Sequence, residues 1–220
     1  MAGKNMFLTG FFVNKFYLCV MKRQLGILLV LIVSQLIIGQ TIVSVELQKN
    51  SSLTIHGSTN LLRFKLIQSG DKLQRKAQNA TLTAVQNKIN LSQNKFPVAL
   101  KNFDSDNIVA LKGFLNLLKS DEYPDIFIQL NSFQLQPELP GKKQAITASA
   151  NINFTITGVT KTYNIPIIAT NAGNQYHIDG NLNIDIRDFG LDPPVTMMGL
   201  IKASEWINVD FHLIFKITVV

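Results

Sequence analysis

The feature that most constrains this chain is a segment, residues 175–187, in which apolar and polar side chains alternate almost without error. One parity is apolar except for a single glycine: Tyr176, Ile178, Gly180, Leu182, Ile184 and Ile186. The other parity is polar: His177, Asp179, Asn181, Asn183, Asp185 and Arg187. Because successive side chains of a β-strand point to opposite faces, the segment predicts one strand with an apolar face and a hydrated face.

Two further segments repeat the alternation, one on each side of the first. The apolar positions upstream are Ala148, Ala150, Ile152, Phe154 and Ile156. Those downstream are Ile207, Val209, Phe211, Leu213, Phe215 and Ile217, with Ile214 as an exception on the polar parity. One-sided strands favour an antiparallel sheet, since parallel sheets are buried on both faces. Closing such a sheet into a barrel hides the apolar face and removes the edges, so we expect a mainly β, antiparallel barrel.

One segment, residues 104–123, departs from the β pattern. Asp104-Ser105-Asp106 offers residue types that commonly cap helices, and Pro124 ends the segment. Apolar residues recur between them at helical spacing: Ile108, Leu111, Leu115 and Leu118. We expect a single amphipathic helix of three to four turns across one end of the barrel. No charge on it indicates a site, so we interpret it as a helix that packs on the core.

The first forty residues have the composition of a leader. A basic segment at residues 21–23 precedes a run of fourteen mainly apolar residues, 25–38. Gly39-Gln40 follows with a small residue, as is typical of the end of a signal peptide. This is the layout of a secretory signal peptide, too short to span a bilayer comfortably; an uncleaved anchor is the alternative. We expect residues 1–20 to be a non-native upstream extension, 21–40 a signal peptide and 41–220 one barrel domain. The protein would then be periplasmic or secreted, with no stable membrane span after cleavage.

The charge of the barrel segment is close to neutral. The whole chain has 21 basic and 14 acidic residues, but four of the basic ones and none of the acids lie before residue 41, which leaves 17 against 14, or +3. The barrel segment has no dense stripe of lysine and arginine. Since nucleic-acid binding needs a concentrated basic face, we expect no nucleic-acid partner.

The residues that commonly perform chemistry are few and dispersed. The single cysteine, Cys19, lies in the leader. The three histidines, His56, His177 and His212, lack the close spacing of a metal motif, and the last two lie on polar parities that we expect to face solvent. Carboxylates gather near one strand end: Asp179, Asp185, Asp188 and Asp192. Acid–base catalysis needs desolvated, converging carboxylates, whereas the first two lie on a hydrated face. We therefore expect no catalytic residue, metal site or resident cofactor, and a protein that is not an enzyme.

Four motifs, taken in order, resemble those of the YceI-like family of secreted, lipid- or polyisoprenoid-binding barrel proteins. They are residues 53–60 (Leu-Thr-Ile-His-Gly-Ser-Thr-Asn), residues 117–126 around Tyr123-Pro124, residues 154–161 (Phe-Thr-Ile-Thr-Gly-Val-Thr-Lys), and Asp188-Phe189-Gly190-Leu191 before Pro193-Pro194. Ser58-Thr59-Asn60 and the leucine-rich helix stand where many members have His-Ser and Asp-Phe-Phe-Asp elements. The chain therefore resembles a divergent subgroup.

The resemblance implies an extended, lipocalin-like antiparallel barrel of about eight strands that holds one elongated apolar molecule, such as a polyisoprenoid, a quinone or another lipid. The apolar parities predict its lining: Ala148, Ala150, Ile152, Phe154, Ile156, Ile178, Leu182, Ile184, Ile186, Val209, Phe211, Leu213 and Phe215. The small residues Ala148, Ala150 and Gly180 among larger ones can leave a slot. The alternative is a packed, ligand-free barrel that serves as an envelope interaction or stress-associated scaffold protein. Either form is compatible with a homodimer.

The loop of residues 188–204 is the candidate mouth of the barrel. It contains Pro193, Pro194, Met197 and Met198, and paired methionines adapt to irregular apolar surfaces. The alternative is that both methionine side chains plug one end of the barrel.

Overall fold

The computed structural model describes residues 40–73, 77–92, 94–136 and 145–220. Every described element belongs to one compact unit, which lies within residues 38–220. The predicted upstream extension and all of the predicted signal peptide except Gln40 lie outside the described residues; Gln40 begins the first strand. Within the described ranges, the helices are too short or too polar to cross a lipid bilayer.

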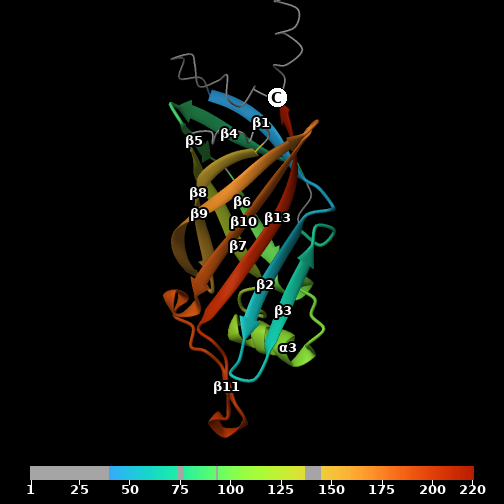
Figure 1. Cartoon of the computed structure of the whole chain (residues 1–220), viewed down its shortest axis with the longest axis vertical. Coiled ribbons are helices and arrows are strands. Elements are labelled where there is room, and N and C mark those ends of the chain that lie inside the picture. Colours follow the sequence, from blue (N-terminus) through green and yellow to red (C-terminus); the bar gives the residue numbers. More distant parts are fainter. Residues whose placement is uncertain (1–39, 74–76, 93, 137–144) are drawn as a thin grey trace, which may run out of the picture. The chain divides into compact units, whose positions relative to one another are not determined.

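Eight antiparallel strands form a closed ring (Figure 1). In pairing order they are β1 (Gln40–Leu47), β4 (Gln78–Val85), β5 (Lys88–Ser92), β7 (Asp125–Leu135), β8 (Ala145–Ile156), β9 (Val159–Ala172), β10 (Gln175–Asp185) and β13 (Trp206–Val219). The ring closes because β13 pairs with β1, from Phe215 opposite Leu47 to Val219 opposite Val43. The predicted antiparallel barrel is thus confirmed, and its three alternating segments are β8, β10 and β13.

The two ends of this barrel are built differently. At one end, which we call the closed end, β1, β4 and β5 complete the ring. At the other, the helix end, β13 pairs with β2 (Ser52–Ser58), β2 pairs with β3 (Arg63–Ser69), and β7 pairs with β6 (Lys95–Ala99). In the described sheet β3 and β6 do not pair with each other, and a single bridge, Ile67 with Asp104, links β3 to the chain beyond β6. The helix end therefore has a gap in its strand wall.

The point at which β13 changes partners explains Ile214, the exception in the alternation. Ile214 is buried although it lies on the polar parity. Its backbone N–H donates to the Ser51 hydroxyl (2.9 Å), and its carbonyl oxygen accepts from the Gln48 N–H (2.8 Å). These residues connect β1 to β2. The break in the pattern thus marks the boundary between the two ends.

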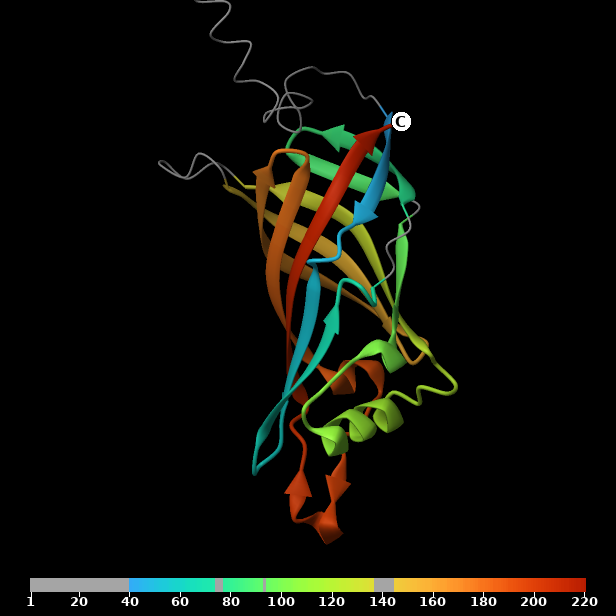
Figure 2. The same cartoon turned by 90° about the vertical axis from the view of Figure 1, so that its right-hand side faces the viewer.

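Helix α3 (Ile108–Leu117) lies across the helix end, after the short helix η2 (Leu100–Asn102) (Figure 2). Its cap is Asn107, whose side chain accepts a hydrogen bond from the Ala110 N–H (2.9 Å), and not the predicted segment 104–106. Its ten residues make fewer turns than we predicted. None of them is fully buried, but Leu111, Phe114, Leu115 and Leu117 pack against the hydrophobic core as predicted, and the helix also covers a cavity.

The segment between β10 and β13 forms a helical turn and a small hairpin. Strand β10 ends at Asp185, two residues earlier than the alternation predicted, because η3 (Ile186–Phe189) begins there with Asp185 as its cap. The hairpin follows, with β11 (Val195–Thr196), η4 (Met197–Gly199) and β12 (Ile201–Lys202). Figure 1 shows this hairpin at the helix end, opposite the C-terminus.

Candidate ligand-binding cavity

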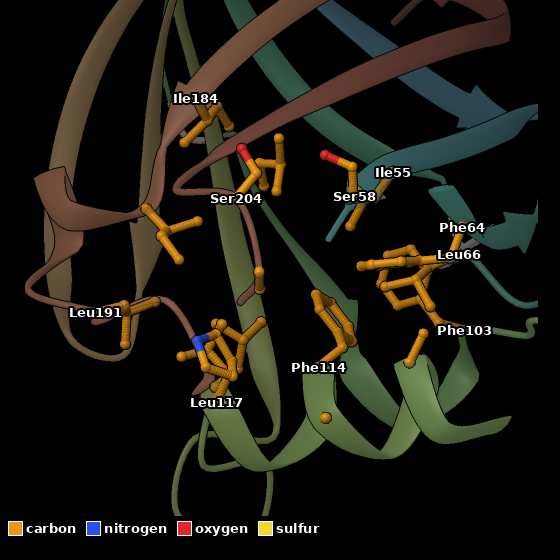
Figure 3. A pocket seen from close by; sticks show the side chains of 18 of the residues that line it. Ile55, Ser58, Phe64, Leu66, Phe103, Phe114, Leu117, Ile184, Leu191 and Ser204 are labelled. Atoms are coloured by element: carbon orange, nitrogen blue, oxygen red, sulfur yellow. The ribbon is translucent and has the colours of Figure 1, made fainter. Parts of the chain in front are cut away.

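A cavity of about 400 Å³ lies at the helix end, between the inner faces of the strands and helix α3 (Figure 3). Ile55, Phe64 and Leu66 line it from β2 and β3, and Phe114 and Leu117 line it from α3. Its volume falls within the range of roughly 300–1,000 Å³ that is usual for small-molecule sites. The gap in the strand wall is therefore covered by α3 without being filled.

The lining is almost entirely apolar. The polar side chains among it are Ser58, Thr59, Asn107, Thr196 and Ser204. Three of these have local partners: Thr59 accepts from the Leu61 and Leu62 N–H groups, Asn107 caps α3, and Ser204 accepts from the Trp206 N–H. In the described structure the Ser58 and Thr196 hydroxyls have no side-chain hydrogen bond to protein. The cavity thus offers apolar walls with two free hydroxyls.

Two of the sequence motifs supply aromatic rings to the cavity wall. Phe189, from the Asp-Phe-Gly motif, stacks on Tyr163 with ring centroids 6.4 Å apart, and Tyr163 meets Phe154 edge-on at 5.9 Å. The Tyr163 hydroxyl donates to Asp188 (3.0 Å), and burial together with this carboxylate raises the pKa of Tyr163. Asp188 therefore has a structural partner, and Phe189 and Phe154 both contact the Tyr163 ring.

The predicted lining divides along the length of the strands. Five of its residues line this cavity: Phe154, Ile156, Ile184, Ile186 and Val209. The other eight do not line it: Ala148, Ala150, Ile152, Ile178, Leu182, Phe211, Leu213 and Phe215. They lie farther along β8, β10 and β13, toward the closed end. The prediction therefore has the residues of the cavity wall on the expected parity, but it extends along each strand beyond this cavity.

The small residues do not leave the slot that we predicted. A Cβ atom at Gly180 would lie 2.2 Å from the ring of Phe211, the residue opposite it in the sheet, so this ring fills the space above the glycine. Ala148 and Ala150 are buried opposite Ile167 and Ile165. Small side chains thus lie opposite large cross-strand neighbours, which occupy the space beside them.

The sequence analysis missed the half of the cavity that β2, β3, β6 and α3 supply. The strands involved are short, and their alternation is correspondingly weak: Leu53, Ile55, Phe64, Leu66 and Val98. On α3, the residues that face the cavity include Ala110, Phe114 and Leu117, beside the stripe of Leu111 and Leu115 that we had singled out. The sequence does contain a signal for this part of the cavity: the helical segment has more apolar residues than a single buried stripe needs.

The predicted mouth residues are dispersed over the hairpin. Pro194 lines the cavity, and Pro193 is half-buried. Met197 and Met198 lie at the tip, 69% and 106% exposed, and do not line the cavity. The alternative in which both methionines plug the barrel does not fit this placement.

Two of the three histidines pair with carboxylates. His56 Nε2 lies 2.7 Å from Asp210 Oδ2, and His212 Nδ1 lies 2.6 Å from Asp179 Oδ1. His177 and His212 are half-buried rather than fully exposed. Arg187 binds the carboxylate of Asp185 and lowers its pKa. Within the described ranges no three His, Cys, Asp or Glu side chains gather as metal ligands would.

The described residues form a closed antiparallel barrel with an apolar cavity beneath a helix. The sequence model of the YceI-like domain matches residues 70–215, about two thirds of the chain. The chain therefore belongs to the YceI-like family, and the resemblance drawn from the four motifs is confirmed.

Solved structures of low identity are similar to the chain. A polyisoprenoid-binding domain from Saccharophagus degradans, implicated in plant cell wall breakdown, is 11% identical with a TM-score of 0.48, over 78% of this chain and 97% of that one. BcnA of Burkholderia cenocepacia is 15% identical with a TM-score of 0.45, over 74% and 95%. The YceI protein of Campylobacter jejuni is 14% identical with a TM-score of 0.39, over 61% and 78%. No curated protein matches the chain. The family assignment rests on the sequence model alone.

Proposed function

We propose that the protein is a periplasmic or secreted binding protein that encloses an elongated apolar molecule of the polyisoprenoid, quinone or related lipid class. The observation that carries the proposal is the cavity of about 400 Å³ with its nearly all-apolar lining. Each methylene-sized group that moves from water into such a site contributes about 0.8 kcal/mol. A similar barrel is described as polyisoprenoid-binding, which supports this choice of ligand class.

Two groups of residues contact the ligand in different ways. The rings of Phe114, Phe154 and Phe189 supply apolar wall from three different elements. The free hydroxyls of Ser58 and Thr196 can hold one polar head group, which suffices to orient an otherwise apolar ligand. This function needs no catalytic residue and no resident cofactor. Leader cleavage and export belong to the same proposal.

Extraction of the purified barrel unit, residues 40–220, followed by mass spectrometry tests the proposal directly. We expect one apolar molecule per chain, or uptake of an offered prenyl alcohol or quinone after delipidation. A ligand that binds only the folded state must raise stability, by about 2.7 kcal/mol at a hundredfold excess over Kd. A chain that stays empty and whose melting temperature no such compound changes would contradict the proposal and favour the scaffold alternative.

Gly113 provides a variant that blocks the cavity without damage to the fold. It lies on α3, lines the cavity, and a Cβ atom placed on it would contact nothing within 4 Å. Gly113→Phe should fill the cavity and abolish ligand uptake while the protein stays folded. Gly113→Ala is the matched control, which should keep ligand binding. Equal uptake by both variants would place the ligand elsewhere.

A further inference from the structure

The most exposed apolar side chains of the barrel gather at the mouth of the cavity. Among the described residues, six large apolar side chains are more than two thirds exposed. One is the C-terminal Val220; the other five, which we call the mouth patch, are Leu61, Val109, Met197, Met198 and Leu200. They come from the β2–β3 turn, the start of α3 and the tip of the β11–β12 hairpin, all at the helix end (Figure 2). Such a concentration marks an interaction site.

Hydrogen bonds hold two of these three segments together. The Asn60 side chain donates to the Leu200 carbonyl oxygen (2.9 Å) and accepts from the Lys202 N–H (3.0 Å). The Asn60 N–H donates to the Lys202 carbonyl oxygen (3.0 Å). The β2–β3 turn and the hairpin are thus clamped side by side, so Leu61 and the hairpin tip form one fixed surface.

The hairpin tip has a backbone that its residues disfavour. Met197 and Met198 have φ values of 50° and 55°, in the left-handed region that glycine and asparagine occupy at lower cost. Met198 is as exposed as in an extended chain, so its side chain makes no packing contact in the barrel that would offset the cost of this backbone conformation. Local strain combined with full exposure is characteristic of functional segments.

The mouth patch continues into the cavity. Leu61 and Val109 are exposed on one side and line the cavity on the other, and Thr196 and Ile201 of the hairpin line it too. An apolar surface therefore extends from the interior to the hairpin tip. A ligand that enters or leaves along this surface has less contact with water.

The charges around the patch fit an anionic surface. Residues 59–63, 107–113 and 194–202 carry Arg63, Lys112 and Lys202 and no acid; Asp106, Asp192 and Glu205 lie just outside these segments. In the described structure none of the three cations has a salt bridge, and all are exposed. Apolar side chains flanked by basic residues are typical of proteins that bind anionic membranes peripherally.

We propose that the mouth patch docks on the surface of an anionic lipid bilayer. Met197 and Met198 enter the acyl boundary, while Arg63, Lys112 and Lys202 face lipid head groups. Transfer of a cavity ligand between membrane and barrel rests on the proposed function, whereas the docking itself needs no ligand.

Vesicle flotation of residues 40–220, the unit that contains the ring and its core, tests the docking. We expect binding to vesicles of phosphatidylethanolamine and phosphatidylglycerol, and binding weaker by at least about tenfold to phosphatidylcholine alone, because the three cations each favour an anionic surface severalfold. Replacing both Met197→Asn and Met198→Asn should reduce binding at least about tenfold. The melting temperature should not fall, because asparagine suits the left-handed backbone at both positions.

A matched control lies at the opposite end of the barrel. Val219 is 61% exposed near the C-terminus, and Val219→Asn should leave vesicle binding unchanged. Since Cys19 is the only cysteine of the chain, Met198→Cys gives a unique thiol in residues 40–220. An environment-sensitive dye on it should shift to the blue with vesicles, and a dye at Val219→Cys should not.

Three results would overturn the proposal: no binding to either vesicle, equal binding by the double methionine variant, or a dye at position 198 that responds to a purified envelope protein but not to lipid. Failure of the proposed function would give a different set of results. Vesicle binding that persists in a barrel that takes up no apolar ligand would leave the docking in place, and ligand uptake without vesicle binding would leave the cavity function in place.

Discussion

The two ends of this barrel show two ways in which a β-sheet protein can be closed. At the closed end the ring is complete, and Gly180, Ala148 and Ala150 each lie opposite a large neighbour in the sheet. At the helix end β3 and β6 do not pair with each other in the described sheet, and α3 lies over the gap. The same long strands, β8, β10 and β13, run through both ends.

The difference follows from where the backbone hydrogen bonds are made. Strands satisfy their N–H and C=O groups only by pairing at about 4.8 Å, which brings their side chains into contact. A helix satisfies these groups internally, so it can cover a barrel end at whatever height its side chains allow. A cavity can therefore persist under α3 more easily than inside the complete ring.

The largest expected effect concerns side-chain truncation at the two ends. Ile165 is fully buried in β9, and Ile165→Ala should cost about 2–5 kcal/mol of unfolding free energy because it leaves a new void. Leu117 already borders the cavity, so Leu117→Ala creates little new empty space and should cost less, about 1–2 kcal/mol. Urea denaturation measures both. Equal losses would mean that the helix end is packed as tightly as the closed end.

The next effect concerns the glycine beneath an aromatic ring. Gly180→Val should destabilise the fold by about 1–3 kcal/mol, because its Cβ would collide with the Phe211 ring. Adding Phe211→Ala should restore part of this loss, which a double-mutant cycle detects. A purely additive result would show that the collision is not the cause.

Side-chain atoms added at the helix end should raise the stability of the protein rather than lower it. Gly113→Ala should stabilise the protein by up to about 1 kcal/mol, since alanine is the better helix former and its methyl group meets no neighbour. A thermal melt in the absence of ligand measures this gain. A loss of stability would show that the helix is more tightly seated than its geometry indicates.

The smallest effect concerns Tyr163 and pH. Tyr163→Phe removes the hydrogen bond to Asp188 and should cost about 1 kcal/mol at pH 7. The pKa of Tyr163 is raised above its ordinary value of 10, first by burial and then by Asp188. Above pH 10 the phenol of the unfolded chain ionises first, so the wild type loses stability that the variant keeps, and the difference should shrink. A difference that stays constant from pH 9 to 11 would contradict the shift.

The sequence predicted the barrel well and the cavity only in part. The alternation in β8, β10 and β13 shows which face is apolar, and four ordered motifs indicated the family. Parity carries no information on depth along a strand, which is why Ile184 lies in the cavity wall and Phe211 does not. The cover of the cavity also depends on α3, whose position is set by the tertiary contacts of the helix end rather than by its own periodicity.

The change of partner along β13 has a consequence for how the protein folds. This strand is the last element of the chain, yet it pairs with β1 through residues 215–219 and with β2 through residues 208–212. The ring can close only after β13 has been synthesised, so β1 and β2 must wait for this partner. Contacts so distant in sequence slow folding. Until β13 arrives, the edges of β1 and β2 that it covers in the folded barrel stay unpaired.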